Sequence, residues 1–117
     1  MRIFLFLLVL ALVFPVRGAD SASGEIERLI RFVGSSNVRF IRNGTEYSAP
    51  EGADHLRDKL SKAGNRVKTA EDFIEGIASK SYLSGKPYLV KFPDGHTEPT
   101  NSWLKKQLTA DRQQHPQ

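Results

Sequence analysis

A histidine and a lysine four residues apart are the pair in this chain whose types and spacing best suit proton transfer or ligand binding. His55 and Lys59 lie in a segment whose apolar residues recur at helical spacing, so both occupy one side of the expected helix. An imidazole with an ordinary pKa of about 6.5 can carry a proton or donate to a ligand. A histidine at the edge of the core that only hydrogen-bonds the surrounding structure is the alternative, and both interpretations stay open.

Arg42 and the segment Ser79–Tyr88 are the other candidates for binding. Arg42 adjoins a predicted turn and could direct its guanidinium at a carboxylate or phosphate, pair with an internal acid, or cap the C-terminus of a helix. Ser79–Tyr88 concentrates hydroxyls, a glycine and lysines just after a helix. Such a loop can bind an anion or a sugar. However, the C-terminal end of a helix disfavours anions, so a solvent loop whose serines bind the last helical carbonyls is the alternative interpretation.

We predict that these residues form one polar binding surface. Its members are Arg42, Asn43, His55, Lys59, Ser79, Ser81, Ser84, Lys86 and Tyr88. A competing hypothesis is a small hydrolase or transferase in which His55 acts as general base for a hydroxyl of Ser79, Ser81 or Ser84. Because a general base must reach its proton, a separation of about 3.2 Å would favour that enzyme. No residue is assigned a catalytic role.

The established catalytic and metal-binding motifs are missing from the sequence. Ser102 and Lys105 match a serine–lysine pattern, but its companion motifs are absent. The histidines at 55, 96 and 115 lack metal-site spacing, and the chain has no cysteine. We therefore expect neither a cofactor nor a metal.

A β-hairpin is the clearest local structure that the sequence predicts. Two alternating segments, Val38–Arg42 and Thr45–Ser48, flank Asn43-Gly44. Asn-Gly tolerates positive φ at both central positions of a type I′ turn, which fixes the register. Arg42 then faces Thr45, Ile41 faces Glu46, and Phe40 faces Tyr47 on the core side.

The remaining pattern predicts four helices and a third strand, in the order α-β-β-α-α-β-α. A helix over 24–35 has Ser23 as its N-cap, and a capping box with proline, Ser48–Glu51, starts a second that ends near Gly64. Further elements are a helix from Thr69 through about 78 with the broadest apolar stripe, a strand over 88–92, and a helix from about 100. The fold class is α+β, a small antiparallel sheet with helices packed on it, and we expect the third helix to be central.

Residues 1–18 have the features of a cleavable signal peptide. Arg2 precedes an apolar run over 3–14, and cleavage after Gly18 fits the small residues there. The run spans about 18 Å, too short for a ~30 Å hydrocarbon core, so we expect no stable membrane insertion. The mature part is then a single domain over 19–111 with a flexible tail over 112–117.

Composition narrows the function further. The full chain has 17 basic and 13 acidic residues, a net charge of +4, and loss of residues 1–18 removes two arginines and leaves +2. The charges alternate in sign along the chain, whereas a nucleic-acid-binding protein shows a one-signed patch, so we expect no nucleic-acid partner. Without cysteine, neither a disulfide nor a lipid anchor is available.

An ordered set of motifs resembles a family of short exported proteobacterial proteins known only as a domain of unknown function. The motifs are Phe40–Gly44, His55-Leu56 with Lys59, Ala70–Ile74, Ala78-Ser79, Ser84–Tyr88 and Trp103-Leu104. The resemblance implies a bacterial, periplasmic location and no particular activity. In many relatives cysteines stand where this chain has Val38 and Phe92, which implies that a packed apolar pair replaces a disulfide here.

These observations predict a periplasmic or secreted binding or accessory module of the cell envelope, with an unidentified envelope ligand or protein as partner. The small hydrolase or transferase described above is one alternative. An inhibitor-like protein that binds its partner through the hairpin is another.

Overall fold

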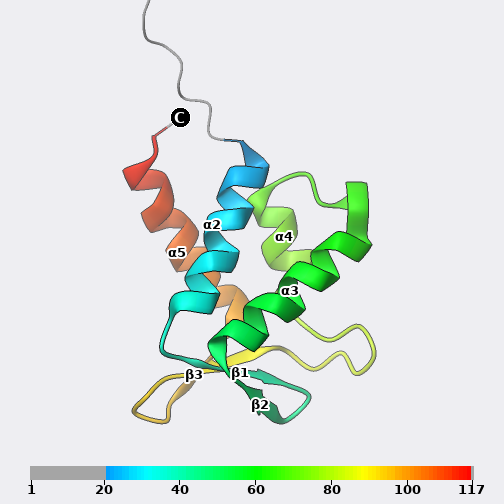
Figure 1. The fold of residues 1–117 in the computed structure, drawn as a ribbon, viewed down its shortest axis with the longest axis vertical. Coiled ribbons are helices and arrows are strands. Elements are labelled where there is room, and N and C mark those ends of the chain that lie inside the picture. Colours follow the sequence, from blue (N-terminus) through cyan, green and yellow to red (C-terminus); the bar gives the residue numbers. More distant parts are fainter. Residues whose placement is uncertain (1–20, 117) are drawn as a thin grey trace, which may run out of the picture.

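The elements of the computed structural model, which describes residues 21–116, confirm an α+β fold in the predicted order (Figure 1). They are α2 (Ala22–Ser35), β1 (Arg39–Arg42), β2 (Thr45–Tyr47), α3 (Ala49–Ala63), the 3₁₀ turn η2 (Gly64–Arg66), α4 (Ala70–Gly76), β3 (Leu89–Lys91), β4 (Thr97–Pro99) and α5 (Thr100–Gln114). The predicted signal peptide lies outside the described residues.

The hairpin has the predicted turn and register. Asn43 and Gly44 have φ values of 53° and 81°, the left-handed conformation that a type I′ turn requires. β1 pairs with β2 antiparallel, and Phe40 lies opposite Tyr47. The turn therefore fixes Arg42 at the end of β1, beside the loop that connects α4 to β3.

The sheet extends on the other side of β1, in the order β2-β1-β3-β4, with antiparallel pairing throughout. Arg39 pairs with Lys91, and continuing that register by one pair places Val38 opposite Phe92. Val38 is buried and Phe92 packs against the core, as expected of an apolar pair at this place. β4 was not predicted, since it has only three residues and includes a proline, which only an edge strand accommodates.

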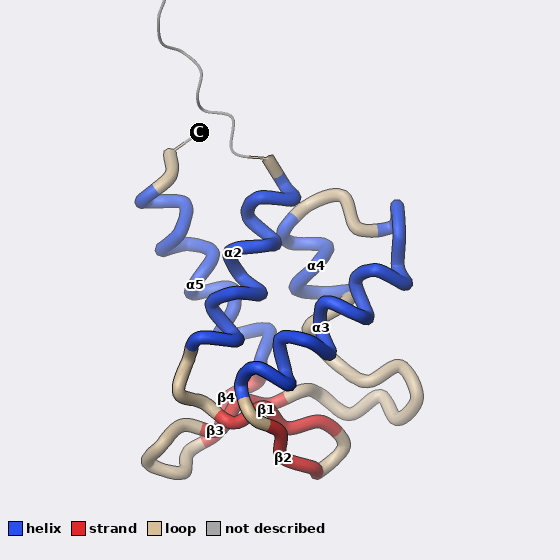
Figure 2. Tube along the Cα trace, in the orientation of Figure 1, coloured by secondary structure: helices blue, strands red, loops and turns tan. Residues whose placement is uncertain are grey.

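The helices cover one face of this sheet, which lies at the bottom of the views in Figures 1 and 2. Phe40 and Val90 point from the sheet into the core, and both are fully buried. α2 lies between α5 and the α3–α4 pair and contacts all three helices (Figure 1). The expectation that the third helix is central is wrong, because α4 has only seven residues and α2 buries the longer apolar stripe, Ile26, Leu29, Ile30 and Val33.

Several boundaries differ from the predictions for identifiable reasons. α2 begins two residues early because the Ser21 hydroxyl, rather than that of Ser23, accepts the hydrogen bond from Gly24 N. α4 ends at Gly76, although Ile77 and Ala78 stay buried beyond it.

The C-terminal boundary is also different. α5 continues through Gln114, into the segment predicted to be a flexible tail. The Arg112 guanidinium holds that turn by binding the carboxylates of Glu25 and Glu71. The capping box of α3 and the end of that helix at Gly64 are confirmed.

Candidate functional site

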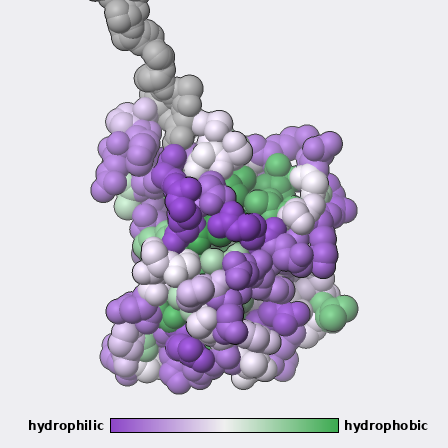
Figure 3. Space-filling view, in the orientation of Figure 1, coloured by the Kyte–Doolittle hydropathy of each residue, from purple (hydrophilic) through white to green (hydrophobic). Residues whose placement is uncertain are grey.

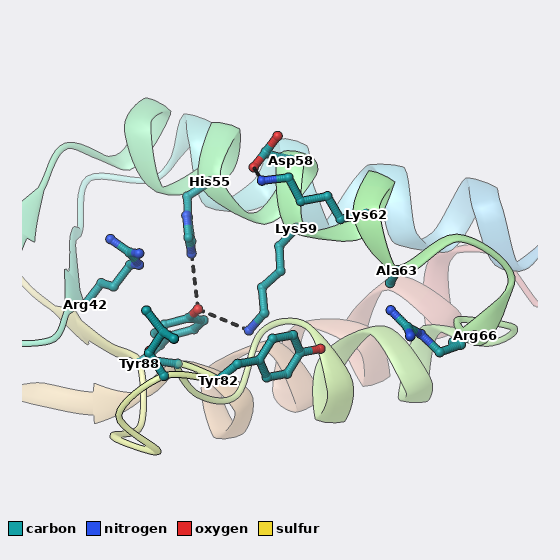
Figure 4. Close-up of a pocket in the computed structure, with 11 residues that line it drawn as sticks. Arg42, His55, Asp58, Lys59, Lys62, Ala63, Arg66, Tyr82 and Tyr88 are labelled. Carbon is teal, nitrogen blue, oxygen red and sulfur yellow. Dashed lines mark hydrogen bonds and ion pairs between the residues drawn. The ribbon is translucent and has the colours of Figure 1, made fainter.

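A basic cleft lies between α3 and the loop that connects α4 to β3 (Figure 4). Its volume is about 250 Å³. The lining comes from β1, α3, η2 and the loop: Arg42, His55, Asp58, Lys59, Lys62, Ala63, Arg66, Ser81, Tyr82, Leu83 and Tyr88. Five members of the predicted surface therefore meet in one cleft, namely Arg42, His55, Lys59, Ser81 and Tyr88.

The Tyr88 hydroxyl joins the two α3 side chains. Lys59 Nζ donates to it at 3.1 Å, and His55 Nε2 lies 3.1 Å from the same oxygen (Figure 4). Tyr88 is almost fully buried beside Phe40, and burial raises the pKa of its hydroxyl. The phenol therefore stays neutral, accepting from Lys59 while remaining free to donate its own hydrogen to His55.

Lys59 has an unusual environment for a lysine. Partial burial, together with the nearby charge of Arg42, lowers its pKa to about 8. Besides Tyr88, its ammonium donates to the Lys80 carbonyl at 2.7 Å and lies 4.0 Å from the centre of the Tyr82 ring. These contacts fix the position of the ammonium and leave its charge without a carboxylate.

His55 is held uncharged by its surroundings. Burial, and then the charges of Arg42 and Lys59, lower the pKa of its imidazole. The ring also packs edge-on against Tyr88. The hydrogen bond to Tyr88 agrees with the interpretation of His55 as a histidine at the edge of the core that binds the surrounding structure. The same ring also lines the cleft, so the binding interpretation stays open as well.

Arg42 lies at the other end of the cleft from Arg66 (Figure 4). Its Nε atom is buried and has no hydrogen-bond partner among the described residues. Within residues 21–116, no carboxylate forms an ion pair with Arg42, Lys59 or Arg66. Asp58, the acid in the lining, pairs with Lys62 at 3.0 Å. The cleft consequently holds three positive charges without an internal counter-charge.

Asn43 and the loop serines support the cleft. The Asn43 side chain donates to the Ser81 hydroxyl and accepts a hydrogen bond from the Ser84 hydroxyl, which ties the hairpin turn to the loop. Ser79 donates to the Ile74 carbonyl at the end of α4, as the alternative interpretation of the loop serines proposed. Lys86 is exposed and is absent from the cleft lining.

None of the three serines is hydrogen-bonded to His55 within the described chain. Their hydroxyls bind Ile74, Asn43 or the loop backbone instead. The pair of nucleophile and base that the hydrolase hypothesis requires is therefore not assembled here.

Six lining residues lie outside the predicted surface, namely Asp58, Lys62, Ala63, Arg66, Tyr82 and Leu83. A signal existed for Lys62, because His55, Lys59 and Lys62 follow the i, i+4, i+7 spacing of one helix face, whereas Arg66 lies in η2, beyond the end of α3. Nothing comparable distinguishes Tyr82. Its position over Lys59 depends on the fold of the loop and on its own hydrogen bond to the Gly76 carbonyl.

A second hollow, of about 340 Å³, adjoins the first and shares Arg42 and His55 with it. Its further lining is Phe40, Tyr47, Glu51 and Asp54, so its charged residues beyond the shared pair are acids. Over the described residues, no group of three or more His, Asp or Glu side chains is placed to bind a metal. In the same part of the chain, no helix combines the length and apolar character needed to cross a bilayer.

The fold is that of a small α+β domain with a basic cleft. The chain belongs to a family of unknown function, DUF5329, whose family model matches residues 20–112. Over 52 residues it is 46% identical to an uncharacterized protein, YfeK, of Salmonella typhimurium (strain LT2). That match covers 44% of this chain and 43% of the relative, less than half of the relative's length. No solved structure matches the chain. The predicted membership of a family of unknown function is thereby confirmed.

Proposed function

We propose that this protein is an exported binding or accessory module of the cell envelope, whose basic cleft holds an oxyanion group of its ligand or partner. The observation that carries the proposal is the set of three cations, Arg42, Lys59 and Arg66, that line one cleft without a carboxylate partner. Grouping like charges in a partly buried site is costly, and a bound anion removes that cost.

The chemistry of the donors suits an oxyanion such as a carboxylate, phosphate or sulfate. A guanidinium offers several N–H groups in a planar fork, and the ammonium of Lys59 is a compact point charge. An entering anion would favour the protonated form of Lys59, whose pKa of about 8 already leaves it mostly charged at neutral pH. Binding then needs little change in protonation.

Binding is better supported than nucleophilic catalysis. The His55 ring is engaged with Tyr88, and the loop serines are bonded elsewhere. A reactive pair of nucleophile and base would need those contacts to be exchanged for new ones. The Lys59 ammonium is already held in the cleft by its contacts with Tyr88 and the Lys80 carbonyl, which favours recognition of an existing anion.

Isothermal titration with sodium sulfate at constant ionic strength tests the proposed cleft. We expect saturable binding of one sulfate per wild-type chain. Because hydrogen bonds to charged groups contribute about 1.5–3 kcal/mol, Arg42→Gln should weaken binding about tenfold or more. Arg66→Gln changes an exposed residue, so it tests the same charge without risk to the core.

Lys106→Gln is the matched control, because it removes one positive charge from α5, outside the cleft. It should change the sulfate dissociation constant by less than about twofold, since screening at physiological salt extends over about 8 Å. Equal losses in Lys106→Gln and Arg66→Gln, or no saturable binding to the wild type, would overturn the proposed cleft.

Export is a separate part of the proposal and has its own test. The pattern of residues 1–18 and the resemblance to exported proteins support it. Mass spectrometry of the fractionated host should find a chain that begins at Ala19 in the periplasm or the medium. An intact chain in the cytoplasmic fraction would contradict export. It would not bear on the proposal that the cleft binds an anion.

A further inference from the structure

We infer that the anion taken by the basic cleft is carried on an apolar chain, so that the ligand class is an anionic amphiphile. This inference rests on the proposed function, because it adds a second recognition element to the same cleft. The element is the pair Tyr82 and Leu83 in the loop lining.

Leu83 is the most exposed large apolar side chain in the described part of the protein. It is 93% exposed, and Tyr82 beside it is 67% exposed. In Figure 3 an isolated green patch at the right edge lies over this loop, next to a purple surface. A single exposed leucine is unremarkable by itself, but this one lines the cleft that collects three unpaired cations.

The loop presents Leu83 on a well-bonded turn. Ser81 N donates to the Lys86 carbonyl at 3.0 Å, and Gly85 N donates to the Ser81 carbonyl at 2.9 Å. The Ser84 hydroxyl binds Asn43 of the hairpin turn. Because the turn is held at both sides, the position of Leu83 relative to the cations is set by the fold.

Tyr82 lies between the Lys59 ammonium in the cleft and the exposed side chain of Leu83. Its ring lies over the Lys59 ammonium, and its hydroxyl donates to the Gly76 carbonyl at 2.6 Å. An anion that reaches Lys59 therefore lies against an aromatic ring, with Leu83 one residue further along the loop. A group attached to that anion meets apolar surface as it leaves the cleft.

Charge complementarity argues for an anionic amphiphile over a second copy of this chain. A second copy that docked on Leu83 through the same surface would bring Arg42, Lys59 and Arg66 close to their own like charges. Like charges in apposition oppose association. An alkyl chain with an anionic end satisfies the cations and covers Leu83 together.

Methyl sulfate and hexyl sulfate are the matched probes for this inference, because they carry the same charge and differ only in chain length. From about 0.8 kcal/mol per buried methylene, burial of one or two against Tyr82 and Leu83 gives hexyl sulfate roughly four- to fifteenfold tighter binding. Leu83→Ser should reduce that preference to less than about twofold. Leu83→Met keeps an apolar side chain of similar volume and should keep the preference.

The outcomes separate this inference from the proposed function. If methyl sulfate binds saturably but hexyl sulfate binds no tighter, or if Leu83→Ser keeps the full preference, the amphiphile is ruled out and the anion cleft stands. If neither probe binds, both proposals fail. Self-association that depends on Leu83, measured by sedimentation, would also overturn the inference.

Vesicles distinguish the two sources of an anionic amphiphile, a membrane and a free molecule. The protein is tested with vesicles of phosphatidylcholine alone and with vesicles that also contain phosphatidylglycerol. Co-sedimentation only with the second kind, and its loss in Leu83→Ser, supports the inference and assigns the amphiphile to a lipid surface. Preference for hexyl sulfate without co-sedimentation supports it and assigns the source to a soluble amphiphile.

Discussion

At the scale of single residues, the Tyr88 hydroxyl connects the charged Lys59 to the neutral His55. Its two contacts, both 3.1 Å, hold these side chains in place on α3. The charge of the cleft then depends on two groups whose pKa values are both lowered, Lys59 to about 8 and His55 below its ordinary value. Anion binding should therefore respond to pH on both sides of neutrality.

Sulfate affinity should fall as pH rises from 7 to 10, because Lys59 loses its proton. The lowered pKa places this loss near pH 8 in the free protein, and bound sulfate, which favours the ammonium, shifts it upward. Lys59→Arg keeps its charge throughout this range, so its affinity should stay nearly constant. Titrations at several pH values measure both. An equally steep fall in Lys59→Arg would show that Lys59 does not control binding.

The sequence predicted that His55 and Lys59 lie together, but it could not predict that Tyr88 and Tyr82 join them. Helical spacing places His55 and Lys59 on one side of α3, and the structure confirms that arrangement. Their meeting with Tyr88 depends on a hydrogen bond that spans 29 residues, which no local pattern encodes. Tyr82 is hidden for the same reason, since its place over Lys59 follows from tertiary structure.

At the scale of elements, α3 packs closely against β1, the strand that carries Arg42. Gly52 in α3 lies against Phe40 in β1, and Arg42 follows two residues later in the same strand. A Cβ atom at position 52 would lie 2.7 Å from the Cβ and Cγ atoms of Phe40. The glycine therefore permits a close approach that also positions Arg42 and His55.

Gly52→Ala should destabilise the protein by about 1–3 kcal/mol, because Phe40 is fully buried and cannot move aside. Gly76→Ala is the matched control, since nothing lies within 4 Å of the added Cβ atom there. In urea denaturation, Gly76→Ala should stay within about 0.5 kcal/mol of the wild type or gain stability. Equal effects of the two substitutions would contradict the close packing of α3 on β1.

Local signals predicted the hairpin and the starts of α3 and α4, because turn and capping chemistry involves residues only a few positions apart. The length of α4 and the existence of β4 were not predictable in this way. Ile77 and Ala78 continue the apolar pattern of α4 but are buried in non-helical backbone. β4 depends on its pairing with β3 at the edge of the sheet.

At the scale of the whole molecule, ion pairs between α2, α4 and α5 close the end of the helical layer that is remote from the sheet (Figure 1). Arg112 binds Glu25, which is only 3% exposed, and also Glu71. Arg28 binds Asp111 through two hydrogen bonds. The contacts of Arg112 with Glu25 and of Arg28 with Asp111 join segments more than eighty residues apart, so sequence patterns could not reveal them.

Arg112→Ala should destabilise the protein by about 1–3 kcal/mol, since it removes charge-assisted hydrogen bonds from the buried Glu25. Arg31→Ala, which removes only an exposed pair with Glu27, should cost less than about 1 kcal/mol. Urea denaturation of both variants measures the difference. Similar losses in the free energy of unfolding would show that the α2–α5 contact stabilises the protein no more than an exposed ion pair does.

The same contacts govern the response to acid. The Arg112 and Arg28 guanidinium groups hold the pKa values of Glu71 and Asp111 below their ordinary values. As pH falls through 4.5 and 3.8 these groups take up protons in the unfolded chain before they do so in the folded one, so this stabilisation is lost progressively below those values. The stability of Arg112→Ala should depend less steeply on pH in that window than the stability of the wild type.

The location of a bound anion is the most direct test of the central claim that the cleft between α3 and the α4–β3 loop is the binding site. Backbone amide shifts, recorded while sodium sulfate replaces sodium chloride at constant ionic strength, report that location. The largest saturable changes should fall at Arg42, within 55–66 and within 80–88. Changes of equal size at the exposed lysines of α5, or changes that increase without saturation, would contradict it.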